Sequence, residues 1–235
     1  MHEVSAQSRF VLPPPPPASV AVNNSAARFP VRRIICVGRN YAAHAREMGR
    51  DPDREPPFFF LKPADTVVDD GTTVPYPPQT RNFHYEIELI VAIGQGGTAI
   101  PVDRALDHVW GYGVGIDLTR RDLQLQAREQ GRPWDWGKGF DFSAPIAPLR
   151  PVSEVGHPNT GRIWLAVDGR LKQDSDIAKL IWPVPDIISI CSQSMALAPG
   201  DIIMTGTPEG VGPVQRGDVM TGGIEGLGEI RIAVG

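Results

Sequence analysis

The segment His84-Tyr85-Glu86-Ile87-Glu88-Leu89-Ile90-Val91-Ala92-Ile93 carries the strongest structural signal in the sequence. Its first half alternates polar and apolar residues and its second half is continuously apolar, which is typical of a strand that runs from a pocket into a core. Successive strand side chains point to opposite faces, so Glu86 and Glu88 share a face, with Cα atoms roughly 7 Å apart. Two carboxylates so placed repel each other and resist burial. We therefore expect a positive group between them.

A second apolar strand is predicted over residues 109–118, and a third acid, Asp117, lies at its end. Three carboxylates form an all-oxygen ligand set, which suits a hard dication such as Mg²⁺, Mn²⁺ or Ca²⁺ and does not suit zinc. We expect Glu86, Glu88 and Asp117 to bind one such ion. His84 lies on the same face as the two glutamates, and a position beside the site or toward solvent is favoured over a role as fourth ligand.

The composition narrows the class of protein. The 235 residues suffice for one sizeable domain, and 25 glycines with 24 prolines favour a fold rich in strands and loops. A net charge of −4 without long runs of Lys or Arg argues against nucleic acid as the partner. No apolar run approaches the roughly 20 residues of a membrane span, and the N-terminus does not read as a signal peptide. The two cysteines show no metal or redox spacing, so we expect a cytoplasmic protein.

The N-terminal residues 1–30 are predicted to form a flexible arm, because Leu12 is followed by five prolines, Pro13 to Pro17. Residues 31–235 are predicted to form a single catalytic domain. Further strands are expected over 34–38, 58–63, 201–204 and 229–234, a hairpin turning at Asp168-Gly169, and helices near 102–108 and over 184–197.

The segment 39–49 is predicted to be a helix that begins at Asn40 as N-cap and ends at Gly49. His44 and Glu47 are spaced i, i+3 and therefore lie on one face of this helix. A carboxylate beside an imidazole raises its basicity and fixes its tautomer, as in a general base. Surface pairs of this kind are common, so the pair alone does not establish a catalytic role.

Another helix is predicted over 118–130, with Thr119 as N-cap. Arg121 and Gln124 share a face at i, i+3, and this first turn lies close to the proposed ion. An arginine at this place can hold a substrate carboxylate with two parallel hydrogen bonds. The other arginines of this segment are expected on a solvated face: Arg120 and Arg128.

Two loops add candidate polar groups. Lys138 lies between two glycines in the aromatic loop 131–141, where it can stabilise an oxyanion, although loop lysines are usually solvated. The glycine-rich loop 205–212 lacks the Gly-Lys-Ser/Thr of a phosphate-binding loop, so nucleotide binding is excluded. Its backbone N–H groups and the Thr207 hydroxyl can instead hold a carboxylate.

Taken together, these segments resemble the fumarylacetoacetate hydrolase superfamily, most nearly its fumarylpyruvate hydrolase and acylpyruvase subgroup. The resemblance runs from about residue 31 to the C-terminus, in order and at similar spacing. It is carried by Cys36-Val37-Gly38-Arg39-Asn40-Tyr41 with His44 and Glu47, Phe59-Phe60-Leu61-Lys62-Pro63, Tyr85-Glu86-Ile87-Glu88-Leu89, Gly115-Ile116-Asp117-Leu118-Thr119-Arg120-Arg121-Asp122-Leu123-Gln124, Lys138-Gly139-Phe140-Asp141 and Thr205-Gly206-Thr207-Pro208-Glu209-Gly210-Val211.

The resemblance implies an α+β fold, a mixed-sheet β-roll of the fumarylacetoacetase C-terminal-domain type, usually a homodimer. It implies a Mg²⁺ or Mn²⁺ site, with Ca²⁺ also suited, which agrees with the strand argument. The implied residues are the metal ligands Glu86, Glu88 and Asp117, the catalytic residues His44, Glu47 and Lys138, and the substrate-binding residues Arg121, Gln124 and Thr207.

The implied reaction is metal-dependent hydrolysis of the C–C bond of an acylpyruvate, a 2,4-dioxo acid, as in the conversion of fumarylpyruvate to fumarate and pyruvate in aromatic, gentisate-type catabolism. Decarboxylation of oxaloacetate or another 2-oxo diacid, or an isomerase or hydratase reaction, fits the same metal site. The pair His44 and Glu47 favours hydrolysis, because the alternatives do not require activated water. A non-catalytic, metal-stabilised binding module would need neither this pair nor Lys138.

Overall fold

Strands form most of the regular structure in the computed structural model, which describes residues 10–42 and 56–235. The largest sheet has the strand order β4-β3-β15-β8-β9-β11-β5, and β12 also pairs with β9. In this order the strands span Phe58–Lys62, Arg33–Gly38, Asp201–Met204, Ile87–Ile93, Val109–Ile116, Ala144–Ile146 and Val67–Asp69, and β12 spans Arg150–Pro151.

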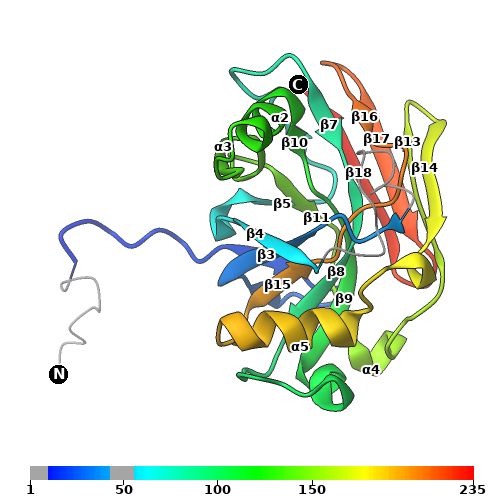
Figure 1. The fold of residues 1–235 in the computed structure, drawn as a ribbon. Helices are drawn as coiled ribbons and strands as arrows, with labels where there is room; N and C mark the ends of the chain where they lie inside the picture. Colours follow the sequence, from blue (N-terminus) through cyan, green and yellow to red (C-terminus); the bar gives the residue numbers. More distant parts are fainter. Residues whose placement is uncertain (1–9, 43–55) are drawn as a thin grey trace.

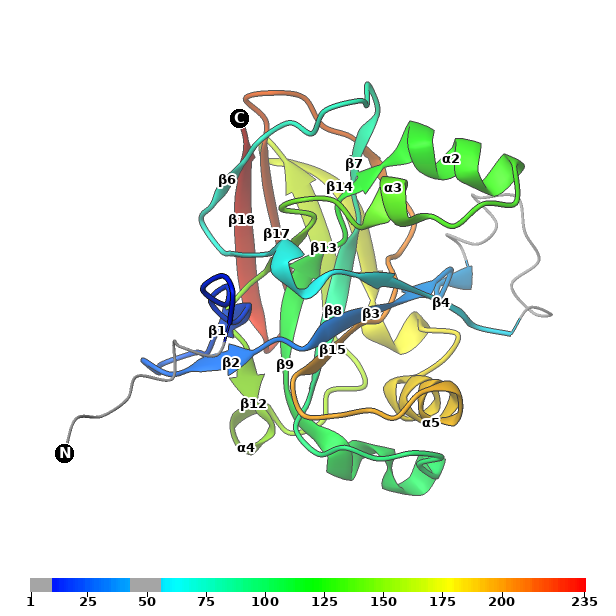
Figure 2. The ribbon, with the colours of Figure 1, turned by 90° about the vertical axis from the view of Figure 1, so that its left-hand side faces the viewer.

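A second sheet of five strands faces β8 and β9 in the order β14-β13-β17-β18-β6 (Figures 1 and 2). Two smaller sheets have the orders β10-β7-β16 and β1-β2. The five strands span Arg170–Asp176, Arg162–Val167, Val219–Ile224, Gly228–Val234 and Thr73–Val74, and the smaller sheets contain Thr119–Arg120, Phe83–Tyr85, Gly212–Pro213, Ser19–Ala21 and Arg28–Pro30.

The core has two parts because the central strands are apolar on both faces. On β8, Leu89 and Val91 point toward the five-stranded sheet, whereas Ile90 and Ala92 point into a second cluster on the opposite face. Glu88 shares the face of Ile90, since side chains alternate along a strand. The predicted acidic face therefore lies at the end of the second cluster.

The helices lie at the edges of the sheets (Figure 1). The helix predicted over 184–197 is confirmed as α5, which ends slightly earlier, and the predicted 102–108 helix is a 3-10 turn, η3. The helical segments are α2 (Arg121–Glu129), α3 (Asp135–Lys138), α4 (Val152–Val155), α5 (Val184–Ser194), η2 (Ala64–Thr66), η3 (Val102–His108) and η4 (Ile177–Lys179).

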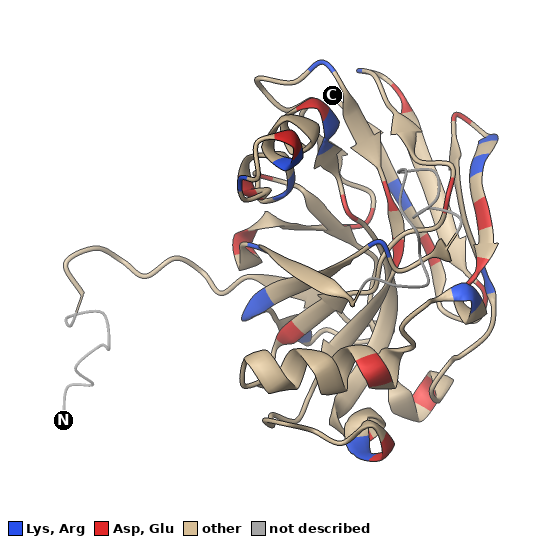
Figure 3. Cartoon of the chain, in the orientation of Figure 1, with Lys and Arg blue, Asp and Glu red and all other residues tan. Residues whose placement is uncertain are grey.

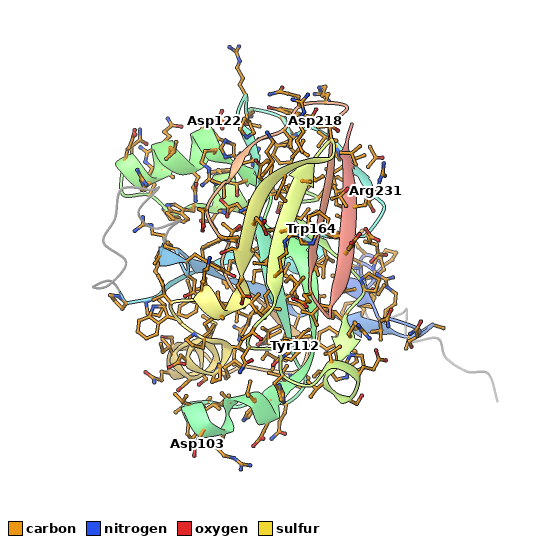
Figure 4. The ribbon with its side chains drawn as sticks, turned by 90° about the vertical axis from the view of Figure 1, so that its right-hand side faces the viewer. Asp103, Tyr112, Asp122, Trp164, Asp218 and Arg231 are labelled. Atoms are coloured by element: carbon orange, nitrogen blue, oxygen red, sulfur yellow. The ribbon has the colours of Figure 1, made fainter. Side chains whose placement is uncertain are left out.

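The predicted α+β fold with a mixed sheet is confirmed. Parallel pairs, β15 with β3, β11 with β5 and β18 with β6, occur beside antiparallel ones. The predicted hairpin is formed by β13 and β14, and positive φ at Asp168 and Gly169 gives its two-residue turn. Figure 4 looks onto the outer face of this sheet, where Trp164 and Arg231 lie.

The N-terminal segment contains a hairpin that the sequence did not predict. Strands β1 and β2 pair with each other, and Val20 and Phe29 are buried against the largest sheet. Arg28 also forms an ion pair with Asp69 of β5 at 2.8 Å. The chain is thus anchored from about Ser19 onward, while the division at residue 30 into an arm and a catalytic domain stays a prediction.

No helix in the described part of the chain combines the length and the apolar character that crossing a membrane requires.

Candidate active site

Three buried carboxylates meet where two strands end. The strand predicted over 84–93 is divided at Glu86, because β7 pairs in the three-stranded sheet and β8 begins at Ile87. Glu88 lies opposite Gly115 in the β8–β9 pair, and the N–H of Asp117 donates to the carbonyl of Glu86 at 2.8 Å. Oxygen atoms of Glu86, Glu88 and Asp117 consequently lie within 4.8 Å of one another.

Three cationic side chains surround these carboxylates. Lys138 Nζ donates to Glu86 at 2.7 Å and to Asp117 at 2.6 Å, and Arg121 pairs with Glu86. Lys62 Nζ lies 2.9 Å from Asp117 Oδ1 and also donates to the backbone carbonyls of Leu118 and Lys138. Positive groups therefore lie beside the acids, as three side chains that contact Glu86 and Asp117.

The role of Lys62 was not predicted, although a signal for it was available. Lys62 lies two and four residues after Phe60 and Phe58 in a strand, so its side chain shares their face. That face turns toward the site, since Phe60 lines the same cleft as the carboxylates.

The donor set fits a divalent cation. Burial, and then the charges of Asp117 and Glu86, raise the pKa of Glu88 well above its usual value. Asp117 Oδ1 accepts no aligned hydrogen bond from any residue that the structure describes, despite its proximity to Lys62. Hard dications take such carboxylate oxygens as ligands, and a bound dication would relieve the mutual repulsion of the acids.

The backbone after β15 fixes one of these acids. The N–H of Gly206 donates to Glu88 Oε2 at 2.7 Å. Gly206 has a φ of +99°, and a Cβ there would come within 2.8 Å of the Cβ of Asn40. A residue without a side chain is therefore needed to bring this N–H to the carboxylate.

Lys138 is buried because the predicted aromatic loop contains the short helix α3, which packs on α2. Its side chain is only 2% exposed, its Nζ also donates to Thr119, and it lies 5.1 Å from the ring centre of Phe60. Burial disfavours its charge, but Asp117 and Glu86 outweigh burial and raise the pKa of Lys138. A protonated lysine is thus held at a buried position beside the carboxylates.

The helix α2 begins at Arg121, later than predicted. The residues in and just before it differ from two expectations, which concern the helix cap and the solvated arginines. Thr119 is in β10 and accepts from Lys138, so it does not cap the helix. Arg120 is buried and lies 4.6 Å from the ring centre of Phe140, and Arg128 lines the cleft. The expectation of a solvated position is wrong for Arg120, because Phe140 packs against it, whereas Arg128 is half-buried at the cleft.

Arg121 and Gln124 lie together in the cleft, since Arg121 donates to the Gln124 Oε1. The Nε of Arg121 approaches His84 Nδ1 at 3.4 Å, and His84 Nε2 contacts Asn82 at 2.7 Å. Burial and the nearby Arg121 lower the pKa of His84 to about 4. His84 is neutral at pH 7 and lies beside the carboxylate cluster, outside the three-residue ligand set.

Thr207 lines the cleft together with residues of α2. Gln173, a buried residue of β14 that the sequence did not predict for the site, donates to Thr207 Oγ1 at 2.9 Å and to the carbonyl of Pro208 at 2.8 Å. Its own Oε1 accepts from the N–H of Ile87 at 3.0 Å. This one amide therefore joins the loop after β15 to the start of β8.

His44 and Glu47 lie outside the described residues, and their catalytic roles stay predictions. Asn40, the predicted cap of their helix, lies within the described residues, and its side chain forms hydrogen bonds with other segments of the chain. Its Nδ2 donates to the carbonyls of Thr205 and Trp182, and its Oδ1 accepts from the N–H of Trp182. Asn40 thus ties the end of β3 to the loop that carries Thr207.

The chain is similar in sequence to enzymes of known activity over most of its length. A fumarylpyruvate hydrolase from Ralstonia sp. is 47% identical over 190 residues, which are 80% of this chain and 98% of that protein. A mitochondrial oxaloacetate tautomerase FAHD1 from Arabidopsis thaliana is 43% identical over 202 residues, 86% of this chain and 90% of the relative.

The crystal structure of fumarylpyruvate hydrolase from Pseudomonas aeruginosa in complex with Mn²⁺ and pyruvate superposes with a TM-score of 0.94 at 58% identity, covering 96% of this chain and 98% of that one. Manganese in that relative agrees with the all-oxygen cation site found here. Residues 33–235 match the family described as fumarylacetoacetate (FAA) hydrolase, C-terminal. The chain therefore belongs to the fumarylacetoacetate hydrolase family.

Proposed function

We propose that this chain hydrolyses the carbon–carbon bond of an acylpyruvate, with fumarylpyruvate as substrate and fumarate and pyruvate as products. The observation that carries the proposal is one cleft in which a buried carboxylate triad lies beside Lys138, Arg121 and Thr207. High identity to fumarylpyruvate hydrolases supports the choice of substrate.

The polar groups of the cleft bind the pyruvyl end. A divalent cation held by Glu86, Glu88 and Asp117 would supply Lewis-acid stabilisation of the negative charge that develops on the pyruvyl oxygens. Arg121 has five N–H donors, of which its contacts with other described residues use three, so it can also donate to a substrate carboxylate. The Thr207 hydroxyl accepts from Gln173, which leaves its own hydrogen for the substrate.

The reacting groups are a base and an oxyanion stabiliser. On sequence grounds we assign His44, oriented by Glu47, as the base that removes a proton from water. The hydroxide adds to the C4 carbonyl, and the Lys138 ammonium stabilises the resulting oxyanion. Collapse of this intermediate breaks the C3–C4 bond, and the electron pair stays on the pyruvyl fragment. Protonation at C3 completes pyruvate, and the acyl fragment leaves as the second acid.

The test is a metal-dependent assay with purified protein. With Mg²⁺ or Mn²⁺ added, the absorbance of the dioxo acid should fall for fumarylpyruvate, and Glu86→Gln should abolish this turnover. Full activity of Glu86→Gln in the presence of chelator would refute the site. His44→Ala should lower kcat by about 10² to 10⁴, the usual worth of a general base. Unchanged kinetics would remove His44 from the mechanism.

Tautomerisation or decarboxylation of oxaloacetate is the second candidate, favoured by 43% identity to an oxaloacetate tautomerase. Oxaloacetate in the same assay separates the two, because turnover of oxaloacetate alone would replace hydrolysis by this activity. We also propose, from the sequence, that the chain acts in the cytoplasm as a homodimer in aromatic catabolism. Light scattering coupled to size-exclusion chromatography tests the dimer.

A further inference from the structure

One face of α2 extends the site from the acidic cluster toward the rim of the cleft. Arg121, Gln124 and Arg128 are spaced i, i+3 and i+7, so they share a helix face, and all three line the cleft. At about 1.5 Å per residue, the Cα of Arg128 lies roughly 10 Å along the axis from that of Arg121. Arg121 and Gln124 are buried and Arg128 is half-buried, so this face runs from the interior to the surface.

A second arginine, Arg39, lines the same cleft. Arg39 lines both the acidic cleft and an adjoining open cavity of about 480 Å³, whose walls include Phe58 and Trp134. Its guanidinium lies 5.2 Å from the ring centre of Phe58, and Phe58 meets Trp134 edge to face at 5.1 Å. Phe58 can occupy this place because a Cβ at Gly38 would come within 2.0 Å of its ring.

The backbone conformation of Arg39 supports a role for this residue in ligand binding. Its φ is +59°, a left-handed conformation that residues with side chains seldom adopt and that is concentrated at functional sites. Arg39 lies directly after β3, where the acidic cleft meets the adjoining cavity.

The balance of charge in the carboxylate cluster indicates which further cation a substrate with two carboxylates needs. Its three carboxylates are balanced by Lys62, Lys138 and Arg121. A bound dication would leave a charge of +2, which matches the carboxylate and the developing enolate oxygen of a pyruvyl group. A second substrate carboxylate brings one more negative charge and needs a cation outside the cluster. Arg128 forms no ion pair with any other residue in the described ranges.

The dimensions match a dicarboxylic acylpyruvate. Six carbon–carbon bonds of about 1.5 Å separate the two carboxylate carbons of fumarylpyruvate, which places them roughly 7 Å apart. This span is comparable with the distance along α2 from Arg121 to Arg128. We propose that Arg128, together with Arg39 of the same cleft, binds the distal carboxylate of the acyl chain, so that the cleft selects acylpyruvates with a carboxylate-ended tail. This inference rests on the proposed function and specifies its substrate class.

A binding experiment tests this selection without requiring hydrolysis. Two unreactive 2-oxo acids of equal length, 2-oxopimelate with a carboxylate end and 2-oxoheptanoate with a methyl end, are titrated calorimetrically into Mg²⁺-loaded protein. The wild type should bind 2-oxopimelate about 10- to 100-fold more tightly, as expected for hydrogen bonds to a charged group. Arg128→Gln should abolish most of this preference and leave the affinity for 2-oxoheptanoate within about twofold.

The matched control is Arg132→Gln, which removes the same charge from an exposed position just beyond α2 and should keep the preference. Arg39→Gln should reduce the preference in the same direction as Arg128→Gln. Equal affinity of the wild type for both acids, or an unchanged preference in Arg128→Gln, overturns the inference. Failure of the proposed function appears separately, as absence of turnover of fumarylpyruvate and acetylpyruvate by the wild type.

Discussion

At the scale of single residues, the buried cluster is a poor way to stabilise a fold. Removing carboxylate and cationic side chains from water costs several kcal/mol per ion, and apolar residues of similar volume are often equally or more stabilising in such positions. Glu86, Asp117 and Lys138 nevertheless lie within a few ångströms of one another in the interior. Their arrangement is therefore better explained by a charged ligand that they receive than by folding stability.

Asp122, at the start of α2 but outside the cluster, provides a pH-dependent prediction. Burial disfavours its charge, but hydrogen bonds from Thr80 and from the N–H groups of Arg81 and Leu123 outweigh it, and the pKa of Asp122 is lowered below 3.8. A lowered pKa contributes stability that is present above the ordinary value and lost as pH falls through the lowered one.

Asp122→Asn should accordingly reduce the free energy of unfolding at pH 6 by about 1 kcal/mol, after allowance for solvent screening. The difference from the wild type should shrink as the pH falls below about 3.8, which urea titrations at pH 6 and pH 3.5 measure. Asp103→Asn, at an exposed position at the other end of the molecule, is the control (Figure 4). A difference independent of pH would contradict the assignment.

The carboxylates could be predicted because strand alternation fixes which side chains share a face, and Glu86 and Glu88 follow that rule closely enough to meet. Strand alternation also places Lys62 on the face of Phe60, but its partner Asp117 and the role of Gln173 could not be predicted, since they depend on which strands become neighbours. A single sequence does not distinguish a buried lysine from a surface lysine. The distinction requires knowledge of a buried partner such as Asp117. The approach of Gln173 to Thr207 likewise joins two segments 34 residues apart.

At the scale of elements, the contact between α2 and α3 positions Lys138 relative to Gln124. A Cβ added at Gly137 would come within 2.8 Å of the backbone nitrogen and the Cβ of Gln124. Because backbone atoms cannot move aside as a flexible side chain does, the two helices must separate to admit even a methyl group. The small residue before Lys138 thus sets how closely the lysine approaches the acids.

Gly137→Ala should therefore lower kcat/KM for the acylpyruvate by about tenfold or more, through displacement of Lys138, and destabilise the fold by about 1–3 kcal/mol. The matched control is Trp136→Ala in the same helix, whose side chain is 78% exposed. Steady-state kinetics and thermal melts of both variants provide the measurement. Equal kinetics in the wild type and Gly137→Ala would show that the spacing of α2 and α3 does not matter.

Element boundaries were predicted less well than element types. The segment 84–93 was predicted as one strand, but it divides at Glu86 because β7 and β8 pair with different neighbours. Propensity carries no signal for such a change of partner, since both halves favour extended backbone. The hairpin β1–β2 was missed for a similar reason, as it gains its stability from packing of Val20 and Phe29 against the largest sheet.

At the scale of the whole molecule, the site exists only in the folded chain. Its charged residues come from β4, from the segments at the ends of β8 and β9, from α2 and from α3. Figure 3 shows that α2 carries charges of both signs. The mixed sheet followed from the family resemblance and not from periodicity, and the order of its strands was not predicted, because local patterns do not specify long-range pairing. Binding at this site is consequently coupled to folding of the entire domain.

This coupling predicts that a divalent cation stabilises the protein. The unfolded chain cannot bring Glu86, Glu88 and Asp117 together, so an ion at 100 times its dissociation constant adds about 2.7 kcal/mol to the free energy of unfolding. For a domain of this size that corresponds to a rise in Tm of about 5–10 °C, measurable by calorimetry with Mn²⁺ and again after chelation. Glu88→Gln should abolish the rise, whereas Glu229→Gln, at an exposed position on β18, should preserve it. An equal rise in Glu88→Gln would mean that the ion binds elsewhere, because only the loss of a ligand distinguishes this site from the acidic surface.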